Sequence, residues 1–124
     1  MSVRGVGVDV ADIARVGAAL QRTPLLARKL FTAGELTTRS GHRRTAASLA
    51  ARFAAKEAVA KVLEHADAGW RLTDIEVGTA PSGRPTLTVG GPLALRARFL
   101  GITTWHLSLS HDGGTAIAVV VAEG

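Results

Sequence analysis

The sequence predicts an α+β fold: a mostly antiparallel sheet with a long central helix packed on it. Alternating apolar patterns typical of strands occur near both ends of the chain, and a long helical segment fills its middle. The order of elements is β-α-α-α-β-β-α-β-β, which favours helices on one face of an antiparallel sheet. At 124 residues, the whole chain, 1–124, is expected to form a single small domain.

The first half of the chain begins with a strand over residues 2–10. Alternation puts three valines on one side of it and two glycines with an aspartate on the other: Val6, Val8 and Val10 against Gly5, Gly7 and Asp9. A helix over 12–22 stops before Pro24, because the residue before proline disfavours helix. A helical turn at 25–30 precedes a capping box, Thr32 with Glu35, that starts a short helix near residue 33.

The second half holds the longest helix and four more strands. A basic loop at 40–44 leads into the helix over 45–65, which residues 67–69 end. The elements expected after it are strands over 74–79 and 85–89 joined by a turn at 81–84, a helix over 93–100, and strands over 105–110 and 115–122 around a hairpin turn at 111–114.

Composition favours acidic partners, and the alternative is a coding bias that gives many arginines for no functional reason. Fifteen Lys and Arg against ten Asp and Glu give a net charge of +5, which suits nucleic acid, phosphorylated ligands or an acidic protein. The absence of cysteine excludes disulfides and cysteine metal sites and is typical of a cytoplasmic protein. No signal peptide or membrane-spanning run is apparent, so no membrane partner is expected.

The long helix carries four charges among residues that are nearly all Ala, Val, Leu or Phe: Arg52, Lys56, Glu57 and Lys61. One interpretation is a partly exposed helix with an ordinary Glu57–Lys61 surface pair. The other is a closely packed helix, whose charges must then be paired or bound to a metal or an ionic ligand.

Asp9 shares its strand face with two glycines, which leaves space for a hydrated Mg²⁺ with a phosphate ligand. Alternatively, Asp9 caps the helix that follows. The segment is not a dinucleotide fingerprint, because Val10 stands where the third glycine belongs, and it is not a P-loop.

Residues 108–114 combine two serines, His111 and a glycine-rich turn whose free N–H groups suit a phosphate. The alternative is a turn that only closes a hairpin. The four histidines form no zinc pattern, and the serines here lie too close to His111 in sequence for a catalytic triad.

Taken together, these segments resemble the acyl carrier protein synthase family of 4′-phosphopantetheinyl transferases over essentially the whole chain. The matching motifs are Gly5-Val-Gly-Val-Asp9, Arg52-Phe-Ala-Ala-Lys-Glu-Ala-Val-Ala-Lys61 and Ser108-Leu-Ser-His111, with Phe31-Thr-Ala-Gly-Glu-Leu36 and Gly83-Arg-Pro85 between them. Ala11 occupies the position where larger two-domain relatives carry a second carboxylate, which favours the small, self-associating class. Asp112-Gly-Gly114 departs from the usual family pattern.

The resemblance implies a Mg²⁺-dependent transfer of 4′-phosphopantetheine from coenzyme A to a serine of an apo acyl carrier protein, with release of adenosine 3′,5′-bisphosphate. Asp9 and Glu57 would bind the metal and, with Lys61, form the catalytic group. The residues implied to contact coenzyme A are Arg52, Lys56, Lys61, Ser110 and His111. The general base stays open between Glu57 and a water on the metal.

The resemblance also implies an acidic carrier-protein partner in fatty acid or polyketide biosynthesis, docked on Arg15, Arg22 and Arg28. It implies a homotrimer with active sites at the subunit interfaces, and it gives nucleic acid no role. Three alternatives remain: a basic nucleic-acid-binding module, a catalytically inactive relative, and another Mg²⁺-dependent enzyme that cleaves pyrophosphate.

Overall fold

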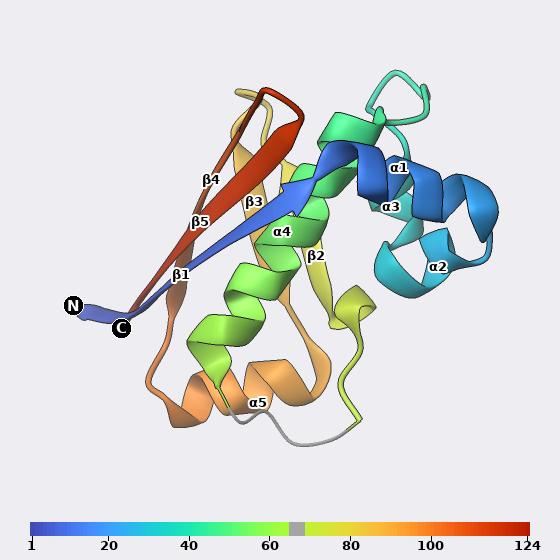
Figure 1. The fold of residues 1–124 in the computed structure, drawn as a ribbon. Helices are drawn as coiled ribbons and strands as arrows, with labels where there is room; N and C mark the ends of the chain where they lie inside the picture. Colours follow the sequence, from blue (N-terminus) through green and yellow to red (C-terminus); the bar gives the residue numbers. More distant parts are fainter. Residues whose placement is uncertain (65–68) are drawn as a thin grey trace.

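The computed structural model describes residues 1–64 and 69–124 (Figure 1). Its elements follow the expected order with two differences: the helical turn expected at 25–30 is a helix in its own right, so four helices rather than three precede the second strand, and a 3₁₀ turn is added. The first half comprises β1 (Val3–Asp12), α1 (Ile13–Arg22), α2 (Leu26–Leu30), α3 (Ala33–Leu36) and α4 (Ala46–Leu63). The second half comprises η1 (Leu72–Asp74), β2 (Ile75–Thr79), β3 (Pro85–Val89), α5 (Gly91–Phe99), β4 (Thr104–Asp112) and β5 (Thr115–Glu123). The long helix was expected to end at residue 65 and to be ended by residues 67–69. Of these, residues 65, 67 and 68 lie outside the described residues.

The α+β prediction is confirmed, but the strands form two antiparallel sheets rather than one. The larger sheet has the order β1-β5-β4, and the smaller one pairs β2 with β3. Strands β3 and β4 lie side by side without forming a ladder. Helix α4 packs against β1 and β5 and also contacts β2, so it runs between the two sheets (Figure 1).

Small residues allow α4 to lie directly on β1. A Cβ atom at Gly7 would stand 2.2 Å from the carbonyl oxygen of Ala58, a distance at which no side chain fits. On the helix, Ala54, Ala55 and Ala58 are completely buried. The sequence suggested that the glycines of β1 open space beside Asp9, but in the structure they do not. They let the helix approach, and this brings the charges of α4 to the aspartate.

Asp12 rather than Asp9 caps the first helix. Its side chain accepts a hydrogen bond from the backbone N–H of Arg15 at 2.9 Å. Strand β1 continues to Asp12, so Asp9 lies inside the strand, on the ladder opposite Ala118. The capping alternative for Asp9 is therefore wrong, and its carboxylate remains free for another partner.

The C-terminal hairpin turn is shorter than expected. Only Gly113 and Gly114, with φ of 56° and 81°, leave the ladder, and Asp112 still pairs with Thr115. A two-residue turn of this kind needs positive φ at both positions, which glycine adopts without strain. His111 and Asp112 thus belong to β4 and not to the turn.

The face of the larger sheet that points away from α4 is apolar and exposed. Val6, Val8 and Val10 of β1 retain 64%, 50% and 61% of their accessible surface. They lie opposite Val121, Val119 and Ile117 of β5 on the ladder. Six aliphatic side chains thus form one outer patch, termed the valine face below. In the described residues, no helix is both long and apolar enough to cross a membrane.

Candidate active site

Asp9 and Lys61 form an ion pair at the contact between β1 and α4. The Lys61 Nζ lies 2.9 Å from Asp9 Oδ1 and donates a second bond, at 3.0 Å, to the carbonyl of Val8. The Lys61 side chain is 57% exposed and that of Asp9 is 19% exposed. Lys61 therefore pairs with the strand rather than with Glu57 on its own helix, and the simple surface pair that the helix spacing allowed is not what the fold produces.

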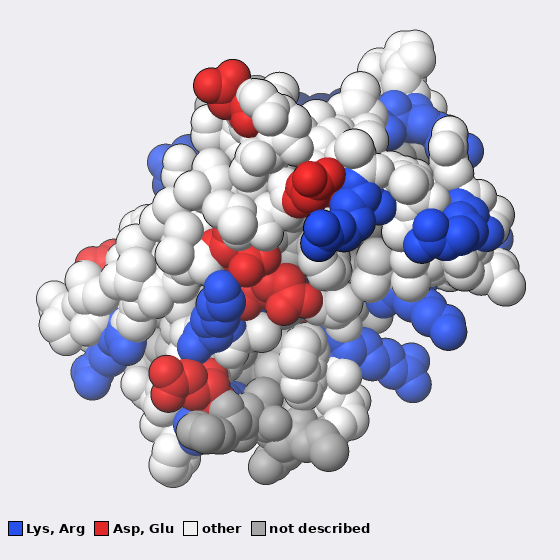
Figure 2. Space-filling view, viewed as in Figure 1, with Lys and Arg blue, Asp and Glu red and all other residues white. Residues whose placement is uncertain are grey.

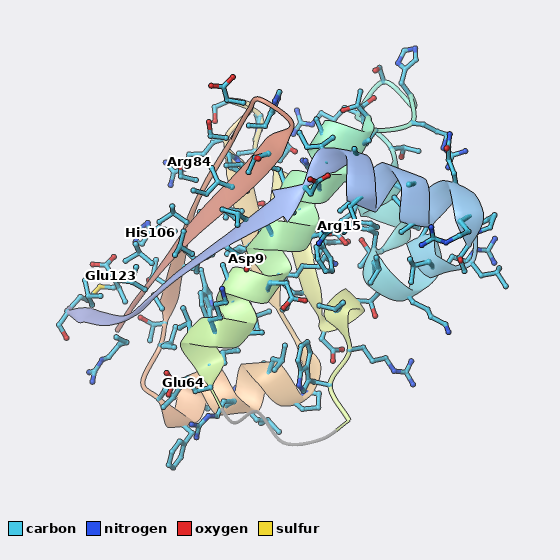
Figure 3. The ribbon with its side chains drawn as sticks, in the orientation of Figure 1. Asp9, Arg15, Glu64, Arg84, His106 and Glu123 are labelled. Carbon is cyan, nitrogen blue, oxygen red and sulfur yellow. The ribbon has the colours of Figure 1, made fainter. Side chains whose placement is uncertain are left out.

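Glu57 lies one turn before Lys61 and is partly buried. Burial raises its pKa, and the nearby negative charge of Asp9 raises it further, while Lys61 opposes both effects. The carboxylates of Asp9 and Glu57 thus lie close enough to repel each other. Acidic side chains gather at the centre of the face shown in Figure 2, where Figure 3 labels Asp9.

The chemistry of these donors suits Mg²⁺. Two carboxylates that repel each other are stabilised by a divalent cation between them. Within 1–64 and 69–124, no cluster of three or more His, Cys, Asp or Glu gathers to enclose a metal. Mg²⁺ is commonly held by one or two carboxylates, with water and substrate phosphates completing its shell. The pair therefore fits a metal that is shared with a phosphate ligand.

Arg44 and Arg52 form a second charged cluster, around Ser48. Arg52 donates to the Ser48 hydroxyl at 2.8 Å, and Arg44 donates to the same oxygen at 3.4 Å. The Nε atoms of both arginines are buried without a hydrogen-bond partner. Burial, and then repulsion by Arg44, lowers the pKa of Arg52 to about 10. Among the described residues neither arginine has a carboxylate ion partner, so the pair is suited to an anionic ligand.

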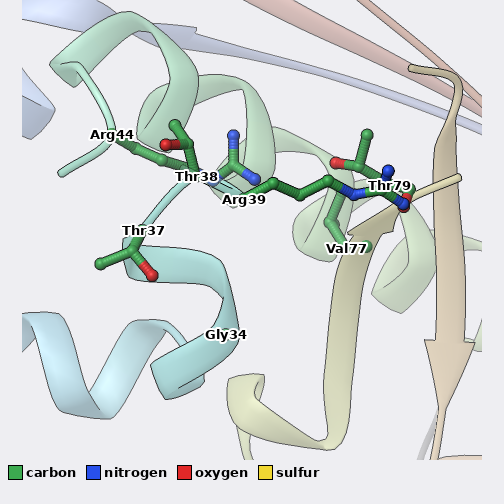
Figure 4. Close-up of a pocket in the computed structure, with 8 residues that line it drawn as sticks. Gly34, Thr37, Thr38, Arg39, Arg44, Val77 and Thr79 are labelled. Atoms are coloured by element: carbon green, nitrogen blue, oxygen red, sulfur yellow. The ribbon is translucent and has the colours of Figure 1, made fainter. Parts of the chain in front are cut away.

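Arg44 also lines an open cavity between α3 and β2 (Figure 4). Arg39 extends across this cavity and donates to the carbonyl of Thr79 at 3.2 Å. The remaining lining residues are Gly34, Thr37, Thr38, Val77 and Gly78. Sequence reasoning assigned no role to Arg39 or Arg44. The only signal was the basic character of the loop before the long helix, which has no motif to align.

Lys56 is not placed to touch a ligand, which corrects the sequence-based expectation. Its side chain is completely buried, and its Nζ donates to Glu35 at 2.6 Å, to Leu72 at 3.0 Å and to Ile75 at 2.7 Å. An ammonium group has three hydrogens, and all three are used inside the protein. The i,i+4 spacing put Lys56 beside Arg52, but the fold covers Lys56 with α3 and β2.

Ser110 and His111 lie away from the carboxylates within one chain. Both are exposed on β4, the edge strand on the opposite side of the larger sheet from β1. On the ladders, Ser110 and Val10 are both paired with Ile117, so Ser110 shares the outer face with the valines. Two strand spacings, about 10 Å, separate β4 from β1. A single subunit therefore does not bring His111 to Asp9.

The three arginines expected to dock a carrier protein, Arg15, Arg22 and Arg28, are all exposed. Arg15 (Figure 3) also lines an apolar hollow between α1 and α2. The other residues around that hollow are Val16, Ala19, Leu26, Leu30 and Phe53. A basic rim beside an apolar hollow suits a partner that is acidic and presents an apolar side chain.

Comparison with known proteins places this architecture in a family. A model of the 4′-phosphopantetheinyl transferase superfamily matches residues 5–120. The holo-[acyl-carrier-protein] synthase of Streptomyces coelicolor is 59% identical over 124 residues, which are 100% of both chains. The crystal structure of the Neisseria meningitidis holo-[acyl-carrier-protein] synthase superposes with a TM-score of 0.85 at 30% identity, covering 99% of this chain and 100% of that one. The Helicobacter pylori enzyme in complex with coenzyme A gives a TM-score of 0.80 at 28% identity, covering 95% and 99%.

The chain therefore belongs to the 4′-phosphopantetheinyl transferase superfamily. Within this class it is an enzyme of the holo-[acyl-carrier-protein] synthase type, since its similarity to those enzymes extends over its full length.

Proposed function

We propose that this enzyme transfers 4′-phosphopantetheine from coenzyme A to a serine of an apo acyl carrier protein in a Mg²⁺-dependent reaction. The observation that carries the proposal is the meeting of Asp9, Glu57 and Lys61 at one point of the β1–α4 contact. In the reaction, the serine oxygen bonds to the β-phosphorus of coenzyme A and the serine proton is released. The bond from that phosphorus to the bridging oxygen breaks, and adenosine 3′,5′-bisphosphate leaves with this oxygen.

The charged residues at the β1–α4 contact have separate proposed roles in this reaction. Asp9 and Glu57 are proposed to hold the metal. Mg²⁺ bound there would neutralise charge on the diphosphate of coenzyme A. Lys61, whose exposed side chain can shift toward a ligand, donates to a phosphate oxygen of the same diphosphate. The two carboxylates need the metal to offset their mutual repulsion, and the ammonium group of Lys61 needs the phosphate as its anionic partner. Binding at this site therefore depends on both the metal and the phosphate.

The nucleotide end is proposed to lie at the Arg44–Arg52 cluster and the adjoining cavity of Figure 4. Two guanidinium groups without a carboxylate partner among the described residues favour a doubly charged phosphate, and the 3′-phosphate of coenzyme A supplies one. Burial strengthens this interaction because the local dielectric constant is low.

The valine face supports self-association. A soluble monomer rarely exposes so continuous a group of aliphatic side chains, and the face includes Val6, Val8 and Val10 at half or more of their full exposure. We propose a homotrimer in which these faces meet. Ser110 and His111, at the edge of the same sheet, would then contact coenzyme A bound mainly by a neighbouring subunit.

The carrier protein is proposed to dock on α1 and α2, with its acidic side chains on Arg15, Arg22 and Arg28 and an apolar side chain in the adjoining hollow. A role in fatty acid or polyketide biosynthesis follows from that partner, and a cytoplasmic location stays a prediction.

Intact-mass spectrometry of the carrier tests the reaction. The protein is incubated with Mg²⁺, coenzyme A and an apo acyl carrier protein, beside Glu57→Gln and a chelator-treated sample. A gain of one phosphopantetheine that both controls lose supports the transfer and the metal together. A gain that survives chelation removes the metal from the proposal. No gain and no coenzyme A binding would contradict the proposal as a whole.

A further inference from the structure

Glu35 and Lys56 form an ion pair that is completely enclosed by the protein. Lys56 Nζ lies 2.6 Å from Glu35 Oε1, and both side chains are 0% exposed. The ring centroid of Phe31 lies 5.5 Å from the same ammonium. The pair contacts neither solvent nor the reacting groups, so the transfer reaction does not by itself account for it.

Lys56 and Glu35 each connect their own helix to another part of the chain. Lys56 ties α4 to the carbonyls of Leu72 and Ile75, at the start of the smaller sheet. Glu35 accepts the N–H of Thr32 at 2.8 Å, which completes one half of the predicted capping box. Its other oxygen accepts the N–H of Val77 at 2.8 Å. The pair thereby sets the position of α3 and β2 relative to α4.

The same segments form the cavity assigned to the nucleotide. Gly34 precedes Glu35 and lies on one wall of that cavity, and Val77 lies on the other. Glu35 is also the carboxylate whose charge acts on Arg52, where it favours the protonated guanidinium. The ion pair thus lies next to the two groups on which nucleotide binding is proposed to depend.

A buried ion pair is a weak source of stability. The cost of removing two charges from water offsets most of their attraction, and apolar replacements of similar volume are often as stable. Three directed hydrogen bonds to each partner, in contrast, define one arrangement of the surrounding segments. The pair therefore contributes a defined arrangement of these segments, which an apolar core would not specify.

We propose that Glu35 and Lys56 are positioning residues that hold the walls of the nucleotide cavity, α3 and β2, at the spacing that coenzyme A requires. The inference rests on the proposed function, because it takes the cavity beside Arg44 as the nucleotide site.

The test compares the double variant Glu35→Leu with Lys56→Met against the wild-type protein. Three quantities are measured: the Tm, the Kd for adenosine 3′,5′-bisphosphate by calorimetry, and the separate kcat and KM for coenzyme A. The double variant is expected to unfold cooperatively with a Tm close to that of the wild type. Its Kd and its KM for coenzyme A are expected to rise about tenfold or more, while kcat changes less because Asp9 and Glu57 are untouched. A folded double variant with unchanged Kd and KM would overturn the inference.

Glu35→Gln serves as a second variant if the double variant does not fold. The glutamine amide can point its –NH₂ either toward the N–H of Val77 or toward the donors of Lys56 and Thr32. In both orientations two hydrogen-bond donors face each other, so the same rise in Kd is expected. Val59→Ala is the matched control, because Val59 is equally buried on the same helix. It should lower the Tm and leave the Kd unchanged. If the wild-type protein binds neither adenosine 3′,5′-bisphosphate nor coenzyme A, the proposed function fails. If the wild type binds and Glu35→Gln binds equally well, only the positioning role fails.

Discussion

Lys61 and Asp9 lie 52 residues apart in the sequence, and their Nζ and Oδ1 atoms lie 2.9 Å apart in the structure. The metal proposed on Asp9 would share this carboxylate with an ammonium group. Lys61 would therefore oppose binding of the metal alone and favour binding of the metal together with an anionic diphosphate.

Lys61→Met is expected to separate these two effects. Without coenzyme A, the variant should bind Mn²⁺ about two- to fivefold more tightly than the wild type, which corresponds to the free energy of a solvent-exposed ion pair. Its kcat/KM for coenzyme A should fall by about tenfold or more, because a charge-assisted bond to phosphate is lost. Electron paramagnetic resonance measures the first value and steady-state kinetics the second. Unchanged Mn²⁺ affinity would show that Lys61 does not compete with the metal.

Arg52→Gln is expected to remove the preference for coenzyme A over dephospho-coenzyme A. Loss of the guanidinium should weaken coenzyme A binding by about tenfold or more, while dephospho-coenzyme A, which lacks the 3′-phosphate, should bind almost as before. Calorimetry with both ligands measures the two affinities. Arg71→Gln, at an exposed position, is the control. Equal losses for both ligands would place the 3′-phosphate elsewhere.

Glu57 should make the metal-free protein less stable as the pH rises. Its pKa is raised above the ordinary value of 4.5, so the folded state holds the proton more tightly than the unfolded state does. This stabilising contribution is complete below the unfolded pKa and disappears as the pH passes through the folded pKa. With a chelator present, Glu57→Gln should therefore gain Tm relative to the wild type as the pH is raised above the ordinary value of 4.5 and through the raised folded pKa. Because Glu57 is partly exposed, the gain should be only about 1–3 °C. A constant difference across the range would contradict the prediction.

Val8→Lys should prevent self-association without unfolding the subunit. Val8 is 50% exposed at the centre of the valine face, so the substitution costs little in an isolated chain but places charges within an interface. Light scattering coupled to gel filtration is expected to show a trimer for the wild type and a monomer for the variant. Circular dichroism checks the fold, and Thr88→Lys, on the other sheet, should remain trimeric. A wild-type monomer at micromolar concentration would exclude the proposed trimer.

Arg15→Glu should raise the KM for the apo carrier protein about three- to tenfold and leave the KM for coenzyme A unchanged. The effect should shrink at high salt, because exposed charges are screened. Arg98→Glu, exposed on α5, changes the net charge equally and should leave both KM values unaltered. Equal effects of the two substitutions would indicate that net charge, not a docking site, attracts the carrier.

Much of the fold follows from local pattern. Strand β3 begins and ends where the sequence predicted, at Pro85 and Val89, because proline and glycine turns bound a short alternating run. Thr32 and Glu35 likewise predicted the start of α3, because the start of a helix depends on groups within four residues. The family motifs also led us to expect Asp9, Glu57 and Lys61 in one site. In the structure Lys61 pairs with Asp9, and the charges of both residues act on Glu57.

Lys56 and Arg44 show which contacts the local sequence pattern cannot predict. Helical spacing puts Lys56 and Arg52 on one side of α4, but spacing cannot say what packs against that side. Glu35, which neutralises Lys56, comes from 21 residues earlier. Arg44 lies in a loop without periodicity, and only the folded chain brings it to the Ser48 hydroxyl that Arg52 also contacts.

The sequence by itself determined the class of fold, the family and the chemical types in the site, because periodicity, caps and motifs act over a few residues. The tertiary structure decided which charge meets which. It paired Lys61 with Asp9 rather than with Glu57, buried Lys56, capped α1 with Asp12 and left the valine face exposed. The physical reason is that ion pairing and burial depend on how closely segments approach. Here that approach follows from glycines and alanines that let α4 lie directly against β1.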